Sequence, residues 1–152
     1  MPTEMYPHPE EFPVSPSPAK TTIAPLLNVR NGAKGIDFYK AAFGAVERFR
    51  TPADSGSVVA QLSIDEADFW LADESPENQN FSPESLQSNT GNSRSTVRIV
   101  LTVDDPDTVF NQAVAAGATV VWPIADQPYR WRVGRIADPF GHHWEIGKPL
   151  IT

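Results

Sequence analysis

The side chains best suited to chemistry stand near the end of the chain. His143 and Glu145 are two positions apart in a stretch typical of a strand, so alternation puts both on one face. An imidazole beside a carboxylate can serve as a general acid/base pair, although a histidine on a strand face is more often structural. His143 and Glu145 are therefore the candidate catalytic residues, and the sequence leaves open whether any reaction is catalysed.

Arginines form a second polar group just upstream. Arg130, Arg132 and Arg135 lie close enough together to bind one small anion, but the group is too short to follow a nucleic-acid backbone. The chain as a whole has 12 basic and 19 acidic residues and a net charge of −7, which also disfavours nucleic acid as a partner. Residues of odd separation on a strand face opposite ways, so only one of Arg132 and Arg135 is expected to face a ligand.

Several classes of function lack the residues that they require. The chain contains no cysteine, which excludes disulfides and thiolate metal sites and is typical of a cytoplasmic protein. No serine stands in a G-x-S-x-G turn, and no glycine-rich phosphate loop follows a strand. No apolar run is long enough to span a bilayer, and the first residues contain no apolar signal segment, so we expect no membrane partner.

The elements that must position these residues occur twice. Leu26–Val29 corresponds to Val100–Val103, and the helical stretch that ends at Gly44 corresponds to the one that ends at Gly117. A half-length repeat indicates two copies of one unit packed together, and the space between such copies is a natural ligand site.

Each copy is predicted to be a β-α-β-β-β unit. Asn31 and Asp105-Pro106 are typical helix starts, and Gly44 and Gly117 are typical helix ends. The predicted strands are Thr22–Val29, Val46–Arg50, Ser57–Asp65 and Ala67–Ala72 in the first copy, and Thr96–Val103, Thr119–Pro123, Arg130–Ala137 and His143–Gly147 in the second.

Four segments follow from this organisation. Residues 1–21 carry six prolines and are predicted to form an extended arm, or equally a disordered tail. Residues 22–73 form the first module and residues 96–149 the second. Residues 74–95, rich in Ser, Asn, Pro and Gly, are either a linker or a flap that closes over a ligand.

The chain resembles the vicinal oxygen chelate superfamily, which includes glyoxalase I, bleomycin-resistance proteins and extradiol dioxygenases. The resemblance is carried by Phe38–Ala45, Ala115–Ala118 and above all Gly134–Ile146 with its Asp-Pro-Phe-Gly turn, and within the superfamily it is greatest to the PhnB-like glyoxalase group. It implies an α+β fold in which two βαβββ modules form a curved, mixed eight-stranded sheet around a cavity, usually in a homodimer. In the enzymes of the family a divalent metal lies in that cavity, held by the first and last strands of each module.

Only one of the four metal-ligand positions that the resemblance implies is kept. Those positions correspond to Ala24, Trp70, Arg98 and Glu145, and of these only Glu145 can ligate a cation. His143 adds a second donor, which is still too few, so we expect no metal cofactor. If the first and last strands lie side by side as in the family, Arg98 faces Glu145 and can neutralise it without an ion. A solvated salt bridge of little energetic weight is an equally good interpretation.

We therefore expect a cavity that binds a small organic molecule without a metal. The expected ligand-binding residues are Arg98, Glu145, His143, Arg132, Trp70, Asn28 and Thr102. Of these, Arg132 matches a position that is often an arginine in the PhnB-like group. Arg135 is assigned to the surface, and Trp144 is expected to pack on the helix side of its strand. The alternatives are a metal-dependent lyase or isomerase of the glyoxalase type, an extradiol dioxygenase, which Arg98 disfavours most, and a purely structural dimer module.

Overall fold

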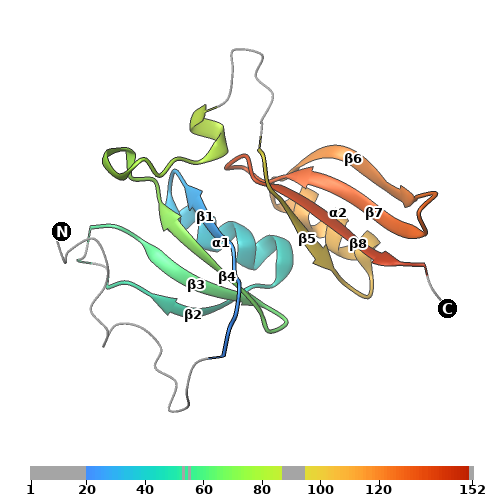
Figure 1. Cartoon of the computed structure of the whole chain (residues 1–152), viewed down its shortest axis with the longest axis horizontal. Coiled ribbons are helices and arrows are strands. Elements are labelled where there is room, and N and C mark those ends of the chain that lie inside the picture. Colours follow the sequence, from blue (N-terminus) through green and yellow to red (C-terminus); the bar gives the residue numbers. More distant parts are fainter. Residues whose placement is uncertain (1–19, 53, 55, 87–94, 151–152) are drawn as a thin grey trace.

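The computed structural model describes residues 20–52, 54, 56–86 and 95–150. They form two modules, each with one helix and four strands in the order predicted from the repeat, and Figure 1 shows the modules side by side. Within the described ranges, no helix combines the length and the apolar character needed to cross a membrane. The proline-rich arm predicted for residues 1–21 lies outside the described part, apart from its last two residues.

Module one contains a mixed sheet with the strand order β1-β4-β3-β2, in which β1 and β4 are parallel. The Asn31 side chain accepts a hydrogen bond from the Lys34 amide at the start of α1, and Gly44 ends the helix with a φ of 67°. The elements are β1 (Leu26–Val29), α1 (Gly32–Phe43), β2 (Val46–Arg50), β3 (Val59–Ile64) and β4 (Ala67–Asp73).

Module two repeats this plan with the strand order β5-β8-β7-β6. Asp105 caps the helix and Pro106 occupies its first turn, as the sequence predicts. The elements are β5 (Arg98–Thr102), α2 (Pro106–Ala116), β6 (Thr119–Asp126), β7 (Trp131–Ala137) and β8 (His143–Pro149). The α+β class and the paired βαβββ modules are confirmed, and the eight strands are divided evenly between two four-stranded sheets.

Strand ends account for most differences from the sequence prediction. The first strand of each module is shorter than expected, so Ala24 precedes β1 rather than lying within it. Conversely, β6 continues to Asp126, three residues past the predicted end at Pro123. Because β6 is an edge strand with irregular pairing on both sides of Trp122, the missing amide hydrogen of Pro123 leaves the sheet intact.

The two modules share one aromatic core. Trp144 of β8 is only 1% exposed and packs against Phe43 of α1, with ring centroids 4.7 Å apart, and against Phe69 of β4. The helices α1 and α2 also contact each other directly. Aromatic packing of this kind makes each module part of the other's core, so the modules are not independent units.

Asp138, in the turn before β8, joins the modules through polar contacts. Its carboxylate accepts hydrogen bonds from the Tyr39 hydroxyl at 2.5 Å and from the Trp144 indole at 3.0 Å. The same carboxylate accepts the amides of Phe140 and His142, and the His142 ring contacts the carbonyl of Asn28 at 2.8 Å. We call this group the Asp138 junction.

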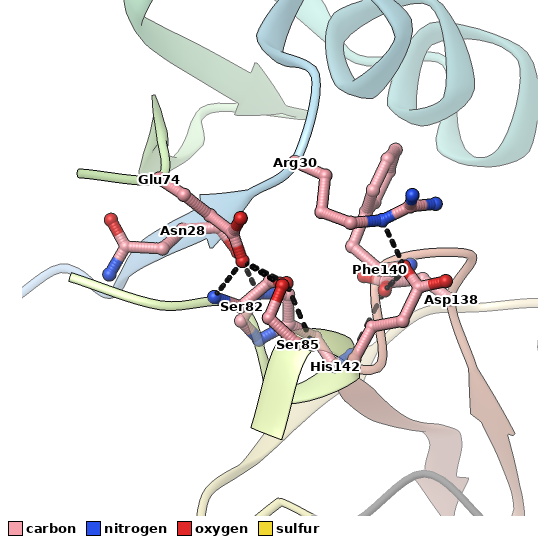
Figure 2. A network of polar contacts seen from close by, with 9 residues as sticks. Asn28, Arg30, Glu74, Ser82, Ser85, Asp138, Phe140 and His142 are labelled. Carbon is pink, nitrogen blue, oxygen red and sulfur yellow. Dashed lines mark hydrogen bonds and ion pairs between the residues drawn. The ribbon is translucent and has the colours of Figure 1, made fainter. Parts of the chain in front are cut away.

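The start of the segment between the modules is packed against the Asp138 junction. Residues 74–86 contain two short 3-10 helices, Pro76–Asn78 and Pro83–Leu86. Figure 2 shows Glu74 receiving the hydroxyls of Ser82 and Ser85, and Arg30 reaching towards the turn that carries Phe140. The amide of Glu84 donates to the carbonyl of Phe140 at 3.1 Å, and its carboxylate pairs with Arg30 at 2.7 Å.

Candidate functional site

Each sheet has one face turned towards its helix and one face that the described chain leaves largely open. In module two the open face carries Arg98 and Val100 of β5, and Val100 is 60% exposed. The strand register adds Glu145 of β8, Arg135 of β7 and Trp122 of β6, since Glu145 pairs with Val100 and with Arg135, and Arg135 pairs with Trp122. We call these residues the open face of module two.

A cluster of one carboxylate and two guanidinium groups lies at the centre of this face. Glu145 Oε1 accepts Arg98 Nη1 at 3.0 Å, and it accepts Arg135 Nη2 at 2.9 Å and Nε at 3.3 Å. The predicted pair of Arg98 and Glu145 is therefore confirmed. Arg135, which sequence reasoning assigned to the surface, completes the group, which we call the Arg–Glu–Arg cluster.

Arg132 lies on the opposite face of β7, which corrects the prediction that it faces the ligand. Its guanidinium donates two hydrogen bonds to Asp107 in the first turn of α2, at 2.6 and 2.7 Å, and one to Asp126 at 3.0 Å. The hydrogen bonds from Arg132 to Asp107 also lower the pKa of the Asp107 carboxyl. Arg132 thus anchors α2 to the sheet.

The remaining predicted residues are divided between the two sheets. His143 is the register partner of Arg98 and Thr102 lies two residues beyond Val100, so both belong to the open face of module two. Trp70 and Asn28 lie on the open face of module one, because their neighbours Phe69, Leu71, Leu27 and Val29 are buried on the helix side. In the register of the repeat, Trp70 pairs with Leu26 as Glu145 pairs with Val100.

The residues at the family's metal position do not fit a divalent cation. Two guanidinium groups lie within hydrogen-bond distance of the Glu145 carboxylate, and Trp70 occupies the repeat-equivalent position in module one. A cation at Glu145 would meet two fixed positive charges in place of donor atoms. Among residues 20–52, 54, 56–86 and 95–150, no three His, Asp or Glu side chains are grouped closely enough to hold a metal.

A hollow of about 410 Å³ lies elsewhere, at the amino end of α1. It is lined by residues of module one and by Glu74, and the Asp73 carboxylate in its lining accepts the backbone amides of Gly32 at 2.6 Å and Val58 at 2.9 Å. The Asp73 carboxylate thus satisfies an amide at the start of α1, and no residue of the Arg–Glu–Arg cluster lines the hollow.

Two mycobacterial proteins are similar to this chain in sequence. An uncharacterized protein of Mycobacterium bovis is 41% identical over 132 residues, which cover 84% of this chain and 83% of the relative. An uncharacterized protein of Mycobacterium tuberculosis is 41% identical over the same share of this chain and 74% of its own length.

Solved structures give the fold. TioX from Micromonospora sp. ML1 matches with a TM-score of 0.63 at 22% identity, covering 87% of this chain and 98% of TioX. A gene product of Arabidopsis thaliana matches with a TM-score of 0.64 at 26% identity, covering 84% and 98%. FosX, a fosfomycin resistance protein of Listeria monocytogenes, matches with a TM-score of 0.62 at 16% identity, covering 88% and 94%.

The family model of the Glyoxalase/Bleomycin resistance protein/Dioxygenase superfamily matches residues 21–146, which include module one, the segment that joins the modules, and module two up to the middle of β8. The match contains the Asp138 junction and the part of β8 that carries Glu145. This chain therefore belongs to the glyoxalase/bleomycin resistance protein/dioxygenase superfamily.

Proposed function

We propose that this protein binds a small organic molecule against its open sheet faces without a metal ion, and that it does so as a cytoplasmic homodimer of the PhnB-like glyoxalase group. The observation that carries the proposal is the Arg–Glu–Arg cluster. Glu145 is the one retained ligand position of the family, and two guanidinium groups neutralise it. An organic ligand can therefore form hydrogen bonds with the Arg–Glu–Arg cluster itself, with no metal ion between them.

The exposed apolar residues of the open faces support a dimer. Val100 and Trp122 are 60% and 62% exposed on module two, and Leu26 is 51% exposed on module one. Large apolar groups gathered on one face mark a surface that another molecule covers. We propose that module one of one copy covers module two of the other, which encloses the ligand and unites Trp70 and Asn28 with the Arg–Glu–Arg cluster.

Binding of small aromatic probes should be unaffected by removing metal ions. We expect ligand-detected NMR of protein purified without chelator to give the same set of bound probes before and after addition of EDTA. Binding that disappears with EDTA and returns with Mn²⁺ would contradict the proposal. That outcome would support the alternative function, a metal-dependent lyase or isomerase. A variant of FosX, a protein with the same fold, has been solved with Mn(II).

The proposed dimer should dissociate when a charge is placed on the open face of module two. Replacing Val100 by glutamate is expected to raise the dimer dissociation constant by about 100-fold or more, because a charged carboxylate would replace an apolar side chain at the interface and lose its hydration there. Light scattering during size-exclusion chromatography measures this change. Ala115→Glu, an equal change at an exposed position of α2, should leave the mass unchanged. A Val100→Glu protein that keeps the dimer mass would refute this pairing.

A further inference from the structure

We propose that the ligand is a small organic acid, and that Arg98 binds its anionic group while Glu145 holds the place of that anion in the free protein. This inference rests on the proposed binding function and adds the chemical class of the ligand. It follows from how the hydrogen bonds of the Arg–Glu–Arg cluster are divided.

The two arginines differ in how many donors they have left. Arg135 gives two N–H groups to Glu145 and its side chain is 22% exposed. Arg98 gives one, through Nη1, and its side chain is 54% exposed. Among the described residues, Nε and Nη2 of Arg98 have no acceptor, so this guanidinium retains one edge of its donor fork for an incoming carboxylate or phosphonate.

The charge of the cluster also favours an anion. Two guanidinium groups face one carboxylate, which leaves one positive charge on a chain whose net charge is −7. All three hydrogen bonds converge on Oε1 of Glu145, and among the described residues Oε2 accepts none. The carboxylate therefore resembles a bound acid that a ligand can partly replace.

The surroundings of the cluster suit the organic part of such a ligand. Val100 is the register partner of Glu145, and Trp122 is the register partner of Arg135. Both side chains are exposed and lie on the same face as the two guanidinium groups. A positive centre beside a flat apolar ring selects an acid with an aromatic or apolar body rather than an inorganic anion.

The experiment compares matched acidic and neutral probes. Benzoate and phenylphosphonate are titrated against benzamide on the full-length wild-type protein, with chemical shifts as the readout. We expect saturable binding of the two acids and much weaker binding of benzamide. Arg98→Gln should weaken binding of the acids by about 10- to 100-fold, the loss of charge-assisted hydrogen bonds. Lys34→Gln, an equal charge change at an exposed position of α1, should not.

A second variant, Glu145→Gln, is expected to change the affinity for acids in the opposite direction. Glu145→Gln removes the internal anion and leaves both guanidinium groups available, so acid binding should become tighter by several-fold. Weaker acid binding in Glu145→Gln would overturn the inference, because Glu145 would then be a ligand-contacting or metal-ligating group. The expected tighter binding cannot arise from a loss of folding, because unfolding could only weaken binding.

The outcomes also separate the inference from the proposed function. If benzamide binds as tightly as benzoate, and Arg98→Gln changes neither, the binding function stands and the anion assignment is wrong. If no probe, acidic or neutral, gives a saturable shift at millimolar concentration, both are wrong.

Discussion

Replacing Trp144 by alanine is expected to lower the free energy of unfolding by about 3 to 5 kcal/mol, the range measured for deleting a large buried aromatic side chain. The loss would be a large share of the total, since domains of this kind are stable by only about 5 to 15 kcal/mol. Guanidinium denaturation followed by circular dichroism measures it without depending on tryptophan fluorescence.

The expected loss is large because Trp144 packs against both modules at once. The ring belongs to β8 of module two, yet its aromatic neighbours Tyr39, Phe43 and Phe69 all belong to module one. Removal leaves a cavity that spans the contact between the modules, where neither module can close it by moving alone.

Tyr129→Ala provides the control, because Tyr129 is 66% exposed in the turn before β7. This change should alter the free energy of unfolding by no more than about 0.5 kcal/mol. A Trp144→Ala protein that loses less than about 1 kcal/mol would show that the two modules are stabilised separately.

The helices could be predicted because their signals are local. Asn31 and Asp105 each accept the amide three residues ahead, and Gly44 and Gly117 each end a helix with positive φ. These features depend on a few neighbouring residues, so they can be predicted from the sequence alone. The pair of Arg98 and Glu145 is not local, and it was predicted only because the resemblance supplied the pairing of the strands.

The exchange of roles between Arg132 and Arg135 has a physical cause. Alternation shows that the two side chains face opposite ways, but it does not say which of them faces the helix. The missing signal was Ile136, which shares its face with Arg132 and is fully buried against the core. An apolar residue of this kind fixes the phase of the strand and so places Arg135 on the open face.

The Asp138 junction could not be predicted from the sequence. Its Asp-Pro-Phe-Gly turn is recognisable, yet the Tyr39 hydroxyl that reaches the carboxylate comes from a helix 99 residues earlier. No periodicity or local propensity links two such positions. The same applies to Glu84, whose amide bonds to Phe140 within a segment that reads only as polar loop.

The second large effect is expected at Asp138, where Asp138→Asn should lower the free energy of unfolding by about 2 to 4 kcal/mol. The buried carboxylate accepts four donors through two oxygens. An asparagine keeps the shape but replaces one acceptor oxygen by a donor nitrogen, so buried N–H groups face another donor. Asp37→Asn, on the exposed side of α1, should change stability little in the same denaturation assay.

The pH dependence of stability offers an independent measurement of the Asp138 junction. Burial, and then the neighbouring Asp138 carboxylate, raise the pKa of Tyr39 well above its ordinary value of about 10. The folded protein holds this proton more tightly than the unfolded chain, so the contribution to stability is complete below pH 10 and is lost as the pH rises further. Wild-type stability should therefore fall above about pH 10, and Tyr39→Phe should lower stability at neutral pH while flattening that fall. An equally steep alkaline loss of stability in Tyr39→Phe would assign the titration to another group. The Tyr39 proton would then make no contribution to the pH dependence of the contact between the modules.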